Sequence, residues 1–135
     1  MKAELDARGL ITSAEKRLDG CRRSLARTDL SEHEIENEFI AASHAINLIS
    51  RACLSAIGHR GEKPEAPLAI TVITLEAGRR GIAFRRDLAS DLKWINRTRN
   101  GSVHDGAVEE VSDADARDAL AYATEYLAIG WRIVG

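Results

Sequence analysis

Apolar residues recur at intervals of three and four positions along most of the chain, which is the period of an amphipathic α-helix. The first stripe runs through Ala7, Ile11, Ala14, Leu18, Cys21 and Leu25. The second runs through Ile35, Phe39, Ala42, Ile46, Ile49, Cys53 and Ile57. Between the stripes, Ser31 and Glu34 have the spacing of a capping box, and Gly58 is placed to end the second helix. We therefore predict two long helices joined by a short turn.

The second half of the chain predicts three further helices after a loop at residues 59–67, which hold both prolines. The β-branched run at 68–78 would suit a strand if taken alone. A lone strand among helices would leave its backbone unpaired, so we expect a short buried helix there. The next helix is expected to begin near Arg86, with Leu88, Leu92 and Ile95 on its apolar stripe. The last is expected to begin at Ser112 or Asp113, with an apolar side of Leu120, Leu127, Trp131 and Val134.

These patterns predict an all-α fold, an up-and-down bundle of four to five helices in which residues 1–135 form a single domain. A chain of this length can bury a core without disulfides or a structural metal. Cys21 and Cys53 both fall on apolar stripes. In a helical hairpin that turns near Asp29, Cys21 would lie opposite a residue near 38, far from Cys53. We therefore predict two separate buried thiols.

The net charge of −2 excludes a uniformly basic nucleic-acid binder, but the charges are segregated along the chain. Residues 79–99 hold seven basic and two acidic residues, and residues 105–118 hold six acidic and one basic. The positive segment can bind a polyanion, although a solvated helix face is the alternative. The chain has no apolar run of about 18 residues, and its N-terminus carries acids where a signal peptide has an apolar core. We expect a cytoplasmic protein with no membrane partner.

The candidate chemistry begins with Arg99, which occupies the next position on the apolar stripe of the fourth helix. A guanidinium on such a stripe is costly unless it has partners or opens into a cleft. Asn100-Gly101 is a helix-ending signal, and His104 follows it. On a straight helix His104 would lie about 140° around from Arg99, so the two can share a site only if the helix bends or ends there, or if a second copy supplies one of them. The alternative for Arg99 is a buried ion pair with an acid of another helix, such as Glu38.

The segment Arg99-Asn100-Gly101-Ser102-Val103-His104 resembles the Arg-x(4–6)-His motif of the HEPN superfamily. That family consists of small all-helical domains of prokaryotic toxin–antitoxin, CRISPR and other defence systems. The helix layout resembles it over nearly the whole chain, and the motif covers six residues. The resemblance implies an endoribonuclease that needs no metal or cofactor and works as a homodimer, with two motifs in one cleft. It further implies that Arg99 and His104 are catalytic, that Asn100 is auxiliary, and that RNA and a cognate antitoxin protein are partners.

The chemistry of the motif agrees with this implication. RNA cleavage by its own 2′-OH needs proton transfer, which histidine performs near neutral pH. It also needs stabilisation of phosphorane charge, which arginine supplies through bidentate bonds to phosphate oxygens. The expected products are a 2′,3′-cyclic phosphate and a 5′-hydroxyl. The RNA backbone is expected to be held by a basic stripe of Arg85, Arg86, Lys93 and Arg97.

The chain departs from the family pattern at one position, and the resemblance leaves one alternative function open. In a branch of the family, a tyrosine two places after the histidine is the target of an adenylylating antitoxin. Gly106 holds that place here, so this mode of regulation is not expected. HEPN domains without activity serve as binding or scaffold modules. The alternative function is therefore a catalytically inactive helical bundle that binds a partner protein or a nucleotide.

The other candidate residues point to no further chemistry. His33 and His44 are expected to be surface or satisfied core residues. None of the four histidines has an acid three places before it, which excludes a ferritin-like di-metal site, and no Cys-x-x-Cys or Walker loop is present. Tyr122 and Tyr126 lie four residues apart and would suit a dimer face or stacking on RNA bases. Plain helix surface is the interpretation that we favour for them.

Overall fold

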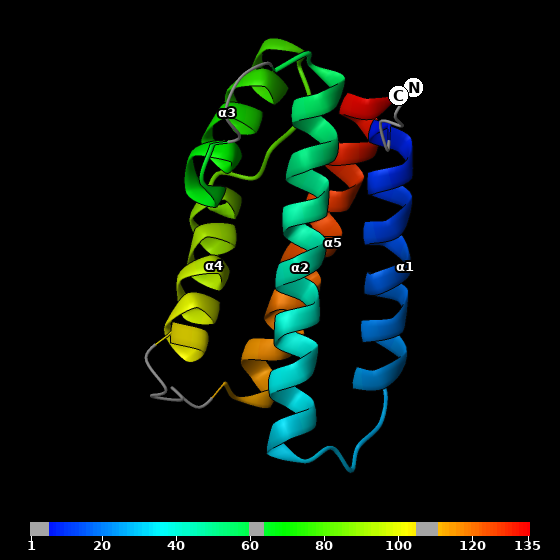
Figure 1. Cartoon of the computed structure of the whole chain (residues 1–135), viewed down its shortest axis with the longest axis vertical. Helices are drawn as coiled ribbons and strands as arrows, with labels where there is room; N and C mark the ends of the chain where they lie inside the picture. Colours follow the sequence, from blue (N-terminus) through cyan, green and yellow to red (C-terminus); the bar gives the residue numbers. More distant parts are fainter. Residues whose placement is uncertain (1–5, 60–63, 105–110) are drawn as a thin grey trace.

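The predicted all-α bundle is confirmed by the computed structural model, which describes residues 6–59, 64–104 and 111–135 and, of residues 101–104, the backbone alone. No strand is present within these ranges. The helices are α1 (Ala7–Leu25), α2 (Glu32–Ala56), α3 (Ala66–Arg79), α4 (Leu88–His104) and α5 (Asp113–Val134) (Figure 1).

Helix α2 is the centre of the bundle and packs against all four other helices. Figure 1 shows α1 on one side of α2, α3 and α4 on the other side, one after the other along the bundle axis, and α5 behind. The two ends of the described chain lie together, because the Arg8 guanidinium donates hydrogen bonds of 3.1 and 2.8 Å to the carbonyl oxygen of Gly135. The contacts of α1, α2 and α5 with one another form the larger half of the core.

The central position of α2 explains its composition. It is long and apolar enough to cross a membrane by those two criteria, with a mean hydropathy of 1.2 over 18 residues, and 56% of that window is buried inside the bundle. A buried helix that packs against four neighbours needs the same composition.

Local sequence signals set the starts of α2 and α5 and the end of α2 as expected. The Ser31 hydroxyl accepts a hydrogen bond of 3.1 Å from the Glu34 backbone N–H, and the Glu34 carboxylate accepts one of 3.0 Å from the Ser31 N–H. The same reciprocal pair joins Ser112 and Asp115 at the start of α5. Gly58 follows α2 with a φ of 75°, a conformation that glycine adopts without strain. At the starts of α2 and α5, side chains therefore satisfy backbone N–H groups that have no partner within the helix.

The β-branched segment at 68–78 is helical, as predicted, and belongs to α3. Pro67 lies in its first turn, where a missing N–H costs nothing. The Thr71 and Thr74 hydroxyls donate to carbonyl oxygens four residues earlier, at 3.1 and 2.7 Å. These bonds satisfy the threonine side chains within the helix, and Ala69, Ile70, Ile73 and Ala77 form the buried face. The opposite face carries Leu68 and Leu75, which are 56% and 61% exposed.

Tyr126 is fully buried, so the prediction of plain helix surface is wrong for this residue. Its hydroxyl lies 2.7 Å from the Ser50 hydroxyl, and its ring packs edge-on against Phe84. The error has a physical reason in the buried face of α5, which is made largely of small residues: Ala116, Ala119, Ala123 and Gly130. These residues let α2 approach closely, and the tyrosine fills the space beside them. Leu120, Leu127, Trp131 and Val134, expected on the core side, are half-buried at its edge.

The buried bond between Tyr126 and Ser50 leads to a first prediction. Tyr126→Phe leaves the Ser50 hydroxyl without its partner and is expected to lower the free energy of unfolding by about 1–2 kcal/mol. Ser50→Ala is expected to have a similar effect, because it strands the tyrosine hydroxyl. The double variant should lose less than the sum of the two, which urea denaturation of all four proteins measures. Strictly additive losses would show that the two hydroxyls do not interact.

Both cysteines are buried free thiols, as predicted. The Cys21 Sγ donates to the backbone oxygen of Glu38 at 3.6 Å, which is the register that a hairpin turning near Asp29 predicts. Burial raises the pKa of Cys21 to about 12 and that of Cys53 to about 12. Both therefore stay protonated at neutral pH and act as small apolar residues of the core.

Candidate functional site

Helix α4 continues through Asn100-Gly101 to His104, so the predicted break between Arg99 and His104 is absent. Asn and Gly tolerate the left-handed conformation that ends a helix, but they do not impose it. On a continuous helix, positions 99 and 104 lie about 140° apart around the axis. The two halves of the motif therefore occupy different sides of α4 within one subunit.

Arg99 lies on the inward side of α4, as the sequence predicts. It follows Leu88, Leu92 and Ile95 on their stripe, and all three are 0% exposed. Arg99 itself is half-buried, and its Nε is shielded from solvent without a hydrogen-bond partner among the described residues. Within the same ranges, the ion pairs join other residues, and none ties Arg99 to Glu38. An unsatisfied cationic donor on an apolar stripe lowers stability, which is a common feature of binding sites.

The other predicted residues of α4 lie on its outer side. Positions 93, 97, 100 and 104 follow one another at intervals of four, three and four, and so form a single stripe. Arg97 and Asn100 are exposed, and Lys93 is half-buried, with its Nζ donating to the Thr71 hydroxyl at 2.8 Å. The structure thus separates Arg99 from the remaining α4 residues of the predicted site.

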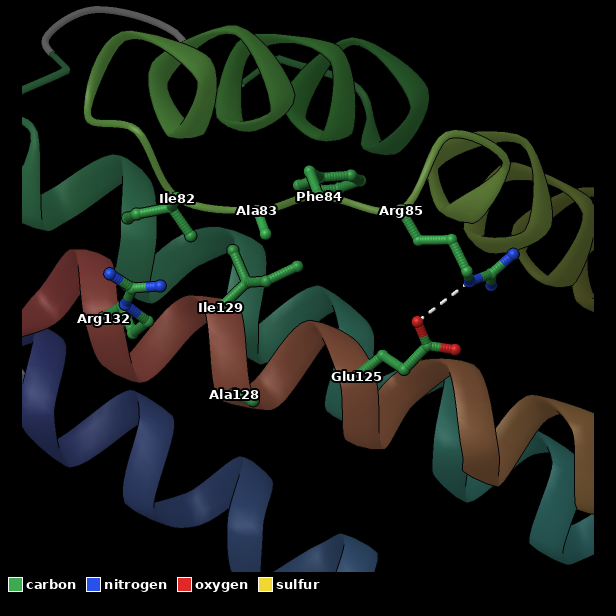
Figure 2. Close-up of a pocket in the computed structure, with 8 residues that line it drawn as sticks. All are labelled: Ile82, Ala83, Phe84, Arg85, Glu125, Ala128, Ile129 and Arg132. Atoms are coloured by element: carbon green, nitrogen blue, oxygen red, sulfur yellow. Dashed lines mark hydrogen bonds and ion pairs between the residues drawn. The ribbon is translucent and has the colours of Figure 1, made fainter.

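Arg85, which was expected to hold RNA, forms ion pairs with two carboxylates. Its Nε lies 3.0 Å from Glu125 and its Nη2 lies 2.8 Å from Asp91, while its guanidinium covers the ring of Tyr122 at 5.4 Å. The hydrogen bonds to these acids raise the pKa of Arg85. Figure 2 shows the Arg85 and Glu125 side chains reaching toward each other from the 82–85 segment and α5. Two negative charges compensate this arginine, so it offers little attraction to a phosphate.

The same ion pair closes one end of a hollow of about 490 Å³ between the 82–85 segment and α5 (Figure 2). Ile82, Ala128 and Ile129 contribute apolar lining, and Arg132 lies at the other end. Among the described side chains of the predicted site, Arg85 borders this hollow, whereas Arg99 and the α4 residues Lys93, Arg97 and Asn100 do not.

His44 is influenced by the charge of Arg99, which the sequence did not predict. It lies on α2, is half-buried, and has its pKa lowered by burial and then by the positive charges of Arg99 and Arg17. The sequence did contain a signal that His44 is partly buried. Ile40, Ala41 and Leu48 surround it on its helix face, where an ordinary solvated face would carry charged residues.

The lowered pKa of His44 makes stability depend on pH. The unfolded chain binds a proton near the ordinary histidine pKa of about 6.5, whereas the folded protein binds it only at lower pH. Acidification through this range therefore favours unfolding. His44→Gln is expected to flatten the decrease in the urea midpoint between pH 7.5 and 5.5 relative to the parent protein. The same slope in both proteins would show that folding does not lower the pKa of His44.

The candidate site thus consists of an inward arginine whose Nε has no hydrogen-bond acceptor among the described residues, a half-buried histidine on α2 whose pKa its charge lowers, and a cationic outer stripe on α4. In the parts of the chain that the structure describes, no three His, Cys, Asp or Glu side chains gather to hold a metal ion. Comparison of the chain with family models, with curated proteins and with solved structures finds no match.

Proposed function

We propose that this protein is a metal-independent endoribonuclease of a toxin–antitoxin or defence system. It acts as a homodimer in which Arg99 of one subunit and His104 of the partner subunit meet in a shared cleft. The observation that carries this proposal is the buried Nε of Arg99, which has no hydrogen-bond partner among the residues that the structure describes and lies on an otherwise apolar stripe. A structural arginine in that place would have a carboxylate or a carbonyl to bind.

The residues divide the work of the reaction among them. Arg99 stays charged at every relevant pH and binds the oxygens of the scissile phosphate, whose charge grows in the transition state. His104 accepts the proton of the attacking 2′-OH and gives a proton to the leaving 5′-oxygen, so the two transfers balance. Asn100 is an auxiliary donor, and Arg86, Lys93 and Arg97 attract the RNA backbone. The reaction breaks the P–O5′ bond as the P–O2′ bond forms, so no oxidant or metal is required.

The second subunit is needed because of the geometry of α4. Its continuous course separates positions 99 and 104 by about 140°, which is too far for both to act on one phosphate within a subunit. Self-association is supported by α3, which packs beside α4 and exposes Leu68 and Leu75 on one face. Exposed apolar surface of this kind is commonly covered by another protein chain.

The same continuous helix favours a second candidate function. If no second subunit completes the site, the chain is a catalytically inactive module that binds a partner protein or a nucleotide through its basic residues. Such a module would bind without cleaving.

The test is an incubation of the purified protein with single-stranded RNA in excess chelator, followed by identification of the product ends. The proposal expects cleavage with a 2′,3′-cyclic phosphate and a 5′-hydroxyl, and loss of cleavage in Arg99→Ala and in His104→Ala. Products with 5′-phosphate ends, or a requirement for added metal, would overturn the mechanism. Absence of cleavage on diverse RNAs would favour the binding module.

A further inference from the structure

The hollow between the 82–85 segment and α5 combines an apolar lining with charged side chains at its two ends (Figure 2). Its volume of about 490 Å³ lies within the range of pockets that bind small molecules. Figure 2 shows the Arg85–Glu125 ion pair at one end and Arg132 at the other, with Ile129 between them. A molecule in the hollow would therefore contact apolar surface along its length and a charged group at its end.

The α5 wall of the hollow is a single stripe of that helix. Glu125, Ala128, Ile129 and Arg132 line the hollow at intervals of three and four, so they share one helix face. Ala128 is exposed, and its side chain is only a methyl group, so the middle of the stripe leaves room that a larger residue would fill. From Glu125 to Arg132 the stripe rises about 10 Å, which sets the length of a fitting ligand.

The opposite wall is the 82–85 segment, which belongs to the connection between α3 and α4. Ile82 is buried, and its backbone N–H donates to the Ala77 carbonyl oxygen of α3 at 2.9 Å. The Phe84 ring packs edge-on against the buried Tyr126 ring of α5. These contacts fix the segment to helices on both sides. The hollow is therefore formed before any ligand binds, as small-molecule sites commonly are.

The two ends of the hollow differ in what they can offer a ligand. At one end, the Glu125 carboxylate lies 3.0 Å from Arg85, whose guanidinium also binds Asp91 at 2.8 Å. At the other end, Arg132 is exposed in the last turn of α5, and no ion pair joins it to another of the described residues. A guanidinium can donate two parallel hydrogen bonds to a carboxylate. The Arg132 end is therefore suited to an anionic group.

We propose that this hollow binds a small molecule in which one carboxylate is attached to an apolar chain of medium length, such as that of octanoate. The carboxylate binds Arg132, and the chain lies over Ala128 and Ile129 toward the Arg85–Glu125 pair. A second charge on the ligand is not required, because the two side chains at that end already bind each other. This site goes beyond the ribonuclease proposal and does not depend on it.

The first experiment follows the methyl resonances of the protein by NMR while octanoate is added. Those of Ala128 and Ile129 are expected to shift and saturate, and those of Ile11 and Leu18, in the core of α1, are expected to stay in place. Hexanoate should bind about threefold to tenfold more weakly, because it lacks two methylene groups. Octan-1-ol, which lacks the charge, should bind about tenfold more weakly. The absence of a saturating shift at Ile129 would overturn the site, and equal binding of octan-1-ol would overturn the carboxylate.

The second experiment removes the positive charge at the end of the hollow. Arg132→Met is expected to weaken octanoate binding about tenfold and to leave octan-1-ol binding unchanged, since only the charged ligand uses the guanidinium. Arg51→Met is the control, because Arg51 is an exposed arginine of α2 outside the lining of the hollow. A favourable effect of Arg132 on the α5 dipole alone would alter stability and not the preference between the two ligands. Equal effects of the two variants on octanoate binding would contradict an Arg132 site.

The third experiment fills the hollow. Ala128→Leu is expected to weaken octanoate binding at least about tenfold, because the larger side chain takes the place of the ligand chain. Ala121→Leu is the matched control, since Ala121 is exposed two turns earlier on α5 and does not line the hollow. Urea denaturation shows whether both variants fold as the parent does. Unchanged binding in folded Ala128→Leu protein would place octanoate elsewhere and overturn the proposal. No RNA is present in these experiments, so their failure is distinct from a failure of the cleavage assay.

Discussion

Arg99→Met is expected to lower the rate of RNA cleavage by about a thousandfold and to leave the protein as stable as before, or more stable. The loss of rate follows from removing a fixed positive charge at the position where phosphorane charge develops, which typically costs about a hundredfold to a thousandfold or more. The stability follows from the surroundings of Arg99, because its stripe is apolar and its Nε has no partner in the described part of the protein. Replacing such a group with an apolar side chain of similar length is expected to raise the free energy of unfolding by up to about 1 kcal/mol.

This opposition of activity and stability distinguishes a binding arginine from a structural one. Arg97→Met is the matched control, since Arg97 is exposed two positions earlier on the same helix. It should change the cleavage rate only through weaker RNA binding, and its stability should stay within about 0.5 kcal/mol of the parent. Cleavage rates measured in chelator report the activity, and urea denaturation reports the stability. If Arg99→Met lowers the free energy of unfolding by about 2 kcal/mol or more and the protein still cuts RNA, Arg99 supports the fold instead.

Gly130→Val is expected to be the most destabilising single change in the core, with a loss of about 3 kcal/mol or more. Gly130 lies where α5 crosses α1 and α2. A Cβ added there would meet Ile11 Cδ1 at 2.8 Å and Ile49 Cγ2 at 2.9 Å. The Ile49 methyl is fixed by its β-branch, so it cannot rotate away without moving α2. The gain in helix propensity over glycine, less than about 1 kcal/mol, does not offset this overlap.

Gly20→Val provides the control for Gly130→Val. Gly20 is also in the middle of a helix, but a Cβ there meets nothing within 4 Å. We expect its free energy of unfolding to stay within about 0.5 kcal/mol of the parent value. Thermal melting of both variants beside the parent measures the contrast, with a decrease of about 10 °C or more for Gly130→Val. Equal melting temperatures would mean that α5 does not approach α1 and α2 so closely.

The fold was largely predictable because it depends on local signals. The three-and-four spacing located the helices, and the Ser31–Glu34 capping box marked the start of α2. The hairpin of α1 and α2 even set the register of Cys21 against Glu38. Tyr126 was not predictable in this way, because its burial depends on Ser50, a partner 76 positions away on another helix. The alanines of α5 also spread its apolar character around the helix, so the buried side was not evident.

The candidate site was predictable only in part. The stripe of α4 places Arg99 inward, and the structure agrees. The continuation of α4 past Asn100-Gly101 was not predicted, because these residues permit a helix end without forcing one. Arg85 is neutralised by Glu125, forty positions later, and Arg99 of α4 lowers the pKa of His44 on α2. Such pairings arise from tertiary structure, and the spacing of residues along the chain contains no signal for them.

A mixed dimer tests the central claim most directly. Subunits with Arg99→Ala and subunits with His104→Ala are co-expressed with different affinity tags, and the heterodimer is isolated. If Arg99 of one subunit works with His104 of the other, each heterodimer has one intact site of two and should cut RNA in chelator at about half the parent rate, while both homodimers stay inactive. A heterodimer as inactive as the two homodimers, beside an active parent, would contradict the shared site.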